Sequence, residues 1–135
     1  MEKRTFKADE SLLNDVTDYV EEELEKAGFT YKDILRLKVC IEEVFINVAH
    51  YAYVETTGDV DIGVEHDKAN NQVIFTFEDS GVQFNPLAKE DPDVTLTAQE
   101  RQIGGLGIFI CKKIMDDIQY NYTNEKNILT MMKKI

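Results

Sequence analysis

The chain has 135 residues, 43% of them hydrophobic and 30% charged, a length and balance typical of one globular domain, which we expect to span residues 1–135. Its 15 basic and 26 acidic residues give a net charge of −11, which excludes nucleic acid as an expected partner because phosphate backbones would be repelled. No apolar run approaches the ~20 residues that span a bilayer and no signal-peptide pattern opens the chain, so we expect no membrane contact and a cytoplasmic location.

The first elements that the sequence predicts are a short strand and a helix. Residues 5–8 fit the strand, and Asp9 or Ser11 offers a side-chain oxygen to cap a helix over about 11–27. Gly28 fits the left-handed position that ends such a helix. The outward acidic residues of this helix are most simply a solvated face, so we assign the segment no chemistry.

A second helix is expected from about residue 33 to residue 53, and it gives the first functional signal. Apolar residues surround much of its circumference, which is typical of a central helix. It nevertheless carries Glu43, Asn47 and His50 at spacings i, i+4 and i+7, which places all three on one face. A carboxylate there can deprotonate a hydroxyl or water, and an amide oxygen one turn further on can ligate Mg²⁺. Taken alone the pattern is weak, because solvent-facing polar residues often have this spacing.

Two strands and a long loop are predicted in the middle of the chain. Residues 60–65 and 73–78 alternate apolar and polar side chains, and the polar stretch 66–71 between them fits a hairpin turn. Residues 85–103 contain both prolines and show no sustained period, so we expect a long loop there.

The second of these strands ends in Asp79-x-Gly81, and the motif continues to Phe84 and Pro86. A carboxylate at a strand end can accept a hydrogen bond from the amino group of adenine, and Gly81 lets the backbone approach the ring. A lone Asp-x-Gly is more often a turn than a ligand site, so the motif gains weight only from its continuation.

A helix and a hairpin are predicted at the end of the chain. The helix has one apolar face, formed by Leu106, Ile110, Ile114 and Ile118. The hairpin is expected from strands over 119–123 and 128–133, with residues 124–127 as the turn.

Glycines stand at the entrance of this helix, in the run Gly104-Gly105-Leu106-Gly107. Their unhindered N–H groups and the positive end of the helix dipole can bind a phosphate, although such glycines can also simply relax a junction between loop and helix. The strand-first pattern of a P-loop or Rossmann turn is absent, so a different phosphate cradle is needed.

The two cysteines carry no predicted chemistry. Cys40 and Cys111 both lie inside apolar helical patterns and have no metal-ligand spacing. We therefore expect buried, reduced thiols.

In combination, the three polar motifs resemble the nucleotide site of the GHKL ATP-binding domains. Their order is Glu-x-x-x-Asn on a helix, Asp-x-Gly-x-x-Phe-x-Pro after a strand, and Gly-Gly-Leu-Gly before a helix, with the intervening loop in the position of an ATP lid. Here they occupy residues 43–47, 79–86 and 104–107. The resemblance covers nearly the whole chain, and residues 104–117 are particularly similar to the anti-sigma-factor serine kinases of bacterial partner-switching systems.

The resemblance implies an α/β two-layer sandwich in which a mixed, largely antiparallel sheet packs against helices on one face. ATP would lie between the helices and the sheet, under the lid. The length agrees with the anti-sigma kinase branch, because sensor histidine kinases, topoisomerases and chaperones of this family carry further domains.

The resemblance also implies a role for each motif residue. Glu43 would be the catalytic base, Asn47 would ligate Mg²⁺ and Asp79 would bind adenine. His50 is expected to support the site rather than to catalyse. The residues implied to bind the nucleotide are Asn47, Asp79, Gly81, Phe84, Arg101, Gly104, Gly105, Leu106 and Gly107.

The activity implied is that of an ATP-dependent protein-serine kinase. It would transfer the γ-phosphate to a serine of an anti-sigma factor antagonist protein, with positioning and charge neutralisation supplying most of the rate. The same domain would bind a sigma factor, and the resemblance is compatible with a homodimer.

One departure from the family pattern leaves alternatives open. Related kinases often carry a basic lid residue next to the glycine run, but Gln102 and Ile103 precede it here, and Arg101 or Lys89 would have to substitute. Without such a cation the chain would be a non-catalytic protein-binding module gated by ATP or ADP. A simple Mg-dependent ATPase, with Glu43 activating water, is a further alternative. A protein with no nucleotide at all would require three ordered motifs to arise by coincidence.

Overall fold

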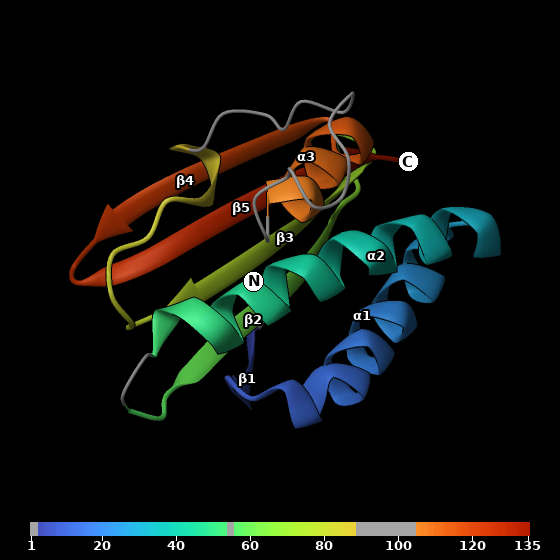
Figure 1. Ribbon diagram of the computed structural model, residues 1–135. Helices are drawn as coiled ribbons and strands as arrows, with labels where there is room; N and C mark the ends of the chain where they lie inside the picture. Colours follow the sequence, from blue (N-terminus) through green and yellow to red (C-terminus); the bar gives the residue numbers. More distant parts are fainter. Residues whose placement is uncertain (1–2, 54–55, 89–104) are drawn as a thin grey trace.

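Three helices cover one face of a five-stranded sheet in the computed structural model, which describes residues 3–53, 56–88 and 105–135 (Figure 1). The strands are β1 (Lys3–Lys7), β2 (Asp59–Asp67), β3 (Gln72–Asp79), β4 (Asp117–Thr123) and β5 (Lys126–Lys134). Their order across the sheet is β1-β2-β3-β5-β4. Each neighbouring pair is antiparallel, so the largely antiparallel sheet is confirmed and no parallel pair occurs among the described strands.

The central helix of the layer is α2, which lies between the other two and packs against both (Figure 1). The helices are α1 (Leu13–Ala27), α2 (Tyr31–Asn47) and α3 (Gly105–Ile114). The shorter turns are the 3-10 turn η1 (Glu10–Leu12) before α1, the π-helical turn η2 (Val48–Ala52) after α2, and the 3-10 turn η3 (Pro86–Ala88). No helix within the described ranges combines the length and the apolar character needed to cross a bilayer.

Local capping groups set the helix boundaries. The Asp9 side chain accepts a hydrogen bond from the Ser11 N–H at 2.9 Å and so starts the turn that leads into α1. Gly28, with φ of 93°, ends α1 in the left-handed conformation that its position in the sequence predicted. The side chain of Thr30 accepts a hydrogen bond from the Asp33 N–H at 3.3 Å, and α2 therefore begins two residues earlier than the apolar pattern indicated.

Apolar side chains hold α2 against both its neighbours and the sheet. Fully buried core residues are Val16, Val20 and Leu24 of α1, Leu37, Ile41 and Phe45 of α2, and Ile62, Phe75, Phe77 and Met131 of the sheet. Burial of one such side chain contributes about 1.5–3 kcal/mol to the free energy of unfolding. The position of α2, which carries the polar motif, is therefore determined by the core.

The last helix is shorter than predicted. Ile118 was expected on the apolar face of that helix, but α3 ends at Ile114 and Ile118 lies in β4. The backbone N–H of Met115 still donates to Cys111 at 2.9 Å, whereas the next N–H, that of Asp116, donates to Met132 of β5 at 2.8 Å. Pairing with β5 thus replaces the next helical turn, and the spacing of Ile118 agreed with a helix only by coincidence.

The final hairpin has a tighter turn than the four residues predicted. Asn124 and Glu125 have φ of 55° and 61°, which is the left-handed pair that a two-residue hairpin turn requires. Lys126 and Asn127, expected in the turn, instead pair with Thr123 and Tyr122 as part of β5. Asn127 is consequently a strand residue and is only 6% exposed.

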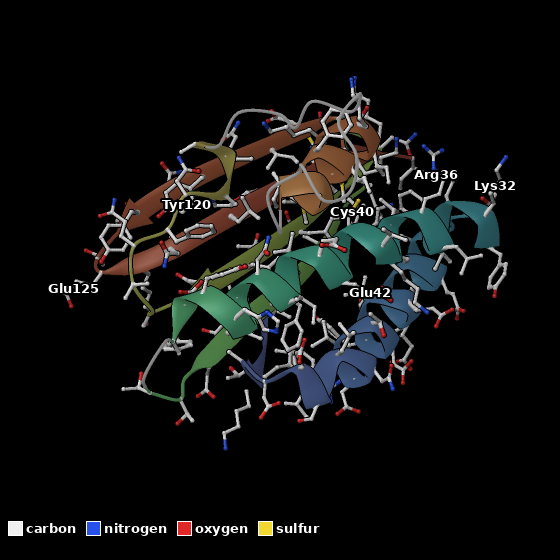
Figure 2. The ribbon with its side chains drawn as sticks, in the orientation of Figure 1. Lys32, Arg36, Cys40, Glu42, Tyr120 and Glu125 are labelled. Carbon is white, nitrogen blue, oxygen red and sulfur yellow. The ribbon has the colours of Figure 1, made fainter. Side chains whose placement is uncertain are left out.

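The two cysteines are free and buried, as predicted. Figure 2 shows Cys40 on the side of α2 that faces α3. The Cys111 thiol of α3 lies 3.6 Å from the carbonyl oxygen of Cys40. A hydrogen bond with Cys40, together with burial, raises the pKa of the Cys111 thiol above its ordinary value, which keeps this thiol protonated.

Candidate nucleotide-binding site

A pocket that is partly open to solvent lies between α2 and the sheet. The lining residues come from both layers and are Val44, Asn47, Val48, Ala52, Phe77, Asp79, Phe84, Pro86, Ile108, Tyr120, Asn127 and Leu129. Most of them are apolar, so the polar side chains among them stand out as the groups that could orient a ligand.

Asp79 is the buried carboxylate of this pocket. It is the last residue of β3 and is only 7% exposed. Its Oδ1 accepts hydrogen bonds from the Gly81 N–H and from the Asn127 side-chain amide, both at 2.9 Å. Its Oδ2 accepts no hydrogen bond from the residues that the structure describes. A buried carboxylate oxygen in a pocket wall without a donor fits a ligand that brings one, such as the amino group of adenine.

The polar residues of α2 divide between the pocket and α3. Asn47 lines the pocket together with Asp79. Glu43, one turn earlier, lies against the first turn of α3, because a β-carbon added to Gly107 would come within 2.1 Å of Glu43 Oε2. The structure therefore places the predicted base directly under the predicted phosphate-binding helix, and the absence of a side chain at Gly107 makes that approach possible.

His50 does not join these residues. Its Nε2 lies 2.8 Å from Glu10 Oε1, its side chain is 47% exposed, and it is absent from the pocket lining. The expectation that it shares a face with Glu43 and Asn47 assumed a regular α-helix. The π-helical turn η2 contains His50 and winds more residues into each turn, so the i+7 relation no longer holds.

Gly81 is packed tightly against the end of the α2 region. A β-carbon at this position would lie 2.2 Å from the carbonyl oxygen of Ala52, the last residue of η2. The same carbonyl accepts a hydrogen bond from the Val82 N–H at 2.9 Å. A glycine is thus needed at position 81 because its backbone packs directly against the backbone of Ala52. This requirement is separate from the contact with a base that the sequence suggested.

Phe84 lines the pocket and is supported from behind. Its ring stacks on Tyr51 with centroids 5.7 Å apart, and its backbone N–H donates to Asn127 Oδ1 at 3.1 Å. The aromatic wall of the pocket is therefore held both by η2 and by β5.

Sequence reasoning missed two polar residues of the pocket wall, Asn127 and Tyr120. Figure 2 shows Tyr120 on β4, beside the segment that follows β3. Its hydroxyl donates to Asn127 Oδ1 at 2.5 Å, and burial raises the pKa of Tyr120, with the charge of Asp79 adding to that effect. The available signal was an asparagine two residues after the hairpin turn, in a strand where asparagine is disfavoured, but the prediction had assigned Asn127 to the turn itself.

Part of the predicted phosphate cradle can be placed. Gly105 is the first residue of α3, followed by Leu106 and Gly107, so these three residues of the glycine run form a helix N-terminus. Gly104, Arg101 and Lys89 lie outside the described residues.

Tyr53 connects the end of the α2 region to the strand that carries Asp79. Its hydroxyl donates to the Asp59 carbonyl at 2.8 Å and accepts from the Ser80 N–H at 2.9 Å. Burial raises the pKa of Tyr53; the hydrogen bond from Ser80 opposes this shift, and the charge of Asp79 adds to it. The stabilisation associated with the raised pKa is fully present below the unfolded pKa of about 10 and is lost as the pH rises through the higher folded pKa.

Tyr53→Phe is expected to lower the free energy of unfolding by about 0.5–1.5 kcal/mol at neutral pH, because both hydrogen bonds are lost. The difference in free energy of unfolding between Tyr53→Phe and the unchanged chain should become smaller above a pH of about 10, because only the unchanged chain then loses stabilisation as Tyr53 ionises. Urea unfolding across this pH range measures both effects. Tyr31→Phe, at a tyrosine that is 68% exposed, is the control and should leave stability unchanged. A difference in free energy of unfolding that stays the same at all pH values would contradict the stabilising role assigned to the Tyr53 hydroxyl.

The fold and the pocket define a two-layer α/β domain with a buried carboxylate between its layers. The family model of the histidine kinase-like ATPase domain matches residues 6–133. The chain therefore belongs to the histidine kinase-like ATPase domain family, and its resemblance to the GHKL domains is confirmed.

Curated relatives narrow this resemblance to one branch. The chain is 31% identical over 111 residues to the serine-protein kinase RsbW of Bacillus cereus strain AH187, a match that covers 77% of this chain and 66% of the relative. It is 28% identical over 117 residues to RsbW of Oceanobacillus iheyensis, covering 81% and 70%. The chain thus spans about two thirds of the length of these relatives.

A solved structure has the same fold. The histidine kinase domain of the blue-light activated histidine kinase from Erythrobacter litoralis EL346 aligns with a TM-score of 0.56 at 14% identity, over 92% of this chain and 59% of that one. At this identity the likeness concerns the fold alone.

Proposed function

We propose that the protein is an ATP-dependent serine kinase that phosphorylates an anti-sigma factor antagonist protein and binds a sigma factor. The binding of a nucleotide is supported by Asp79, a buried carboxylate in the pocket. One of its oxygens accepts no hydrogen bond from the described residues. The name of the curated relatives supports serine phosphorylation. The two partner proteins, a homodimer and a cytoplasmic location rest on the resemblance to anti-sigma-factor kinases.

Each group of the proposed site has one task. Asp79 receives the amino group of adenine, and Asn47, which lines the same pocket, ligates the Mg²⁺ that accompanies the phosphates. The N-terminus of α3, with Gly105 and Gly107, faces the phosphates. Glu43 lies directly against that turn and takes the proton of the attacking serine hydroxyl.

Calorimetric titration with ATP and with ADP, in the presence and absence of Mg²⁺, tests the nucleotide site. We expect binding that depends on Mg²⁺ and that Asn47→Ala weakens mainly when Mg²⁺ is present, because this change removes a metal ligand and leaves Asp79 intact. Absence of binding to the unchanged chain would leave only a protein-binding role.

Asp79→Asn is expected to weaken ATP and ADP by about 1–3 kcal/mol, because a charge-assisted hydrogen bond to the base is replaced by a poorly matched amide. The same titration measures the effect. Asp18→Asn removes the same charge from an exposed position of α1 and serves as the control. Equal affinities for Asp79→Asn and the unchanged chain would discard Asp79 as the residue that binds the base.

A non-catalytic nucleotide-gated module is the second candidate, favoured by the uncharged residues Gln102 and Ile103 directly before the glycine run. Both candidates require nucleotide binding, so only a measurement of phosphate transfer to a protein can distinguish them. The assay follows the γ-phosphate of ATP to a serine of an anti-sigma antagonist, with release of free phosphate recorded in parallel. Nucleotide binding with neither product would favour the module, and free phosphate alone would favour an ATPase.

A further inference from the structure

Asn127 is a buried side chain whose hydrogen-bonding groups all have partners. Its Nδ2 donates to Asp79 Oδ1 at 2.9 Å and to the Val82 carbonyl at 2.8 Å. Its Oδ1 accepts from the Phe84 N–H at 3.1 Å and from the Tyr120 hydroxyl at 2.5 Å. Two donors and two acceptors are the full capacity of an asparagine amide, so this residue has no group left for a ligand.

The sheet register explains why Asn127 contacts Asp79. The two residues are directly opposite each other in the antiparallel pair of β3 and β5. Side chains of such a pair project from the same face at close range. The amide can have only one orientation here, because the reverse orientation would place its oxygen against Asp79 Oδ1 and the Val82 carbonyl.

The hydrogen bond from Asn127 fixes the rotation of the Asp79 carboxylate. Oδ1 accepts from Gly81 on one side and from Asn127 on the other, which occupies this oxygen and leaves Oδ2 as the acceptor for a ligand. A carboxylate held by Gly81 alone could turn about its last bond and present either oxygen. The network therefore defines the position of the acceptor that a base would meet.

The same amide also positions the aromatic wall of the pocket. Its bonds to Val82 and Phe84 hold the backbone that carries the Phe84 ring, and that ring lines the pocket. Asn127 thus determines both the edge at which a base is recognised and part of the surface against which the base lies.

We propose that Asn127 is a positioning residue that gives the pocket its selectivity for adenine over purines with a carbonyl at C6. This inference rests on the proposed nucleotide site. The amino group of adenine donates to the fixed Oδ2 of Asp79, whereas a C6 carbonyl would oppose one acceptor with another. Selectivity of this kind requires that the carboxylate cannot rotate or shift to suit the other base.

The test compares the affinities for ADP and IDP, measured by calorimetry. IDP differs from ADP by the carbonyl at C6 and the proton at N1, and it shares the ribose and phosphates. We expect the unchanged chain to prefer ADP by about tenfold or more. In Asn127→Ala the ADP affinity should fall by about tenfold while the IDP affinity changes by less than about threefold, so the preference is largely lost.

Two further variants separate selectivity from folding. Asn127→Ser leaves room for water to satisfy Phe84 and Tyr120, and should show the same loss of preference if Asn127→Ala does not fold. Thr17→Val removes another buried hydrogen bond, to Asn14 in α1, far from the pocket. It should lower stability in urea without changing the preference for ADP.

Three results would overturn the inference. A fall of the ADP and IDP affinities by the same factor in the Asn127 variants would show a merely structural role. Equal affinity of the unchanged chain for ADP and IDP would remove the selectivity while leaving the nucleotide site in place. Failure of the unchanged chain to bind either nucleotide would remove the proposed function itself, and with it this inference.

Discussion

Glu43→Gln is expected to lower the rate of phosphoryl transfer by about 10²–10⁴-fold, the usual contribution of a general base. The substitution keeps the shape of the side chain and its place under Gly107, so the packing of α2 against α3 is retained. Only the ability to accept the proton of the attacking hydroxyl is lost. ATP affinity should therefore change by no more than about threefold, because the base acts on the nucleophile and does not hold the nucleotide.

The measurement is the rate of transfer to the protein substrate, or of phosphate release where water is the acceptor, beside calorimetric ATP affinity. Glu42→Gln is the matched control, because it removes the same charge from the adjacent position of α2. Successive residues of a helix point about 100° apart, and Figure 2 labels Glu42 on the side of α2 nearer α1. Transfer that is equally fast in both variants would remove Glu43 from the role of base for either acceptor.

Gly81→Ala is expected to have the largest effect on folding, a loss of about 1–3 kcal/mol or more in the free energy of unfolding. Its new methyl group would lie 2.2 Å from the Ala52 carbonyl oxygen and 2.6 Å from its carbon. These are backbone atoms of η2, which cannot move without breaking the hydrogen bond from Val82 to Ala52. Since Asp79 Oδ1 also accepts from the Gly81 N–H, nucleotide affinity should fall as well.

Gly107→Ala is the informative comparison. Its methyl group would meet Oε2 of Glu43 at 2.1 Å, but this oxygen is the end of a flexible side chain and can move aside. Urea unfolding should therefore show a smaller loss for Gly107→Ala than for Gly81→Ala. Equal losses would show that the contact of Gly81 with η2 is no tighter than an ordinary side-chain contact.

The type and order of the elements were predictable because each is recorded in a local pattern. The alternation in β2 and β3 and the apolar repeats of α1 and α2 result from burial of one face, which a sequence shows directly. The boundary at Gly28 follows from a capping residue whose signal is local, whereas the cap at Thr30 was not recognised and α2 begins two residues earlier than predicted.

One error comes from pairing between distant segments, and another comes from a local departure from α-helical geometry. Ile118 had a helical spacing, but the hydrogen bond from Asp116 to Met132 of β5 directs that part of the chain into the sheet. The prediction that His50 shares a face with Glu43 and Asn47 was wrong because a π-helical turn cannot be recognised from apolar spacing.

The candidate site could be predicted where a motif lies within one segment. Asn47 with Glu43, and Asp79 with Gly81, were recognised because each pair is close in the sequence and has a chemical meaning at that spacing. Asn127 could not be found this way, since its partner Asp79 becomes its neighbour only through the register of β3 and β5. The role of each residue in binding or transfer stays a prediction.

The wall of the pocket has an optical consequence. The chain contains no tryptophan, so tyrosine dominates its ultraviolet emission. Tyr120 belongs to the pocket lining, and Tyr51 stacks behind Phe84 on the same wall. A ligand in the pocket would contact the Tyr120 phenol and press on the Phe84 ring that Tyr51 supports, so binding is expected to change the tyrosine emission of the unlabelled chain.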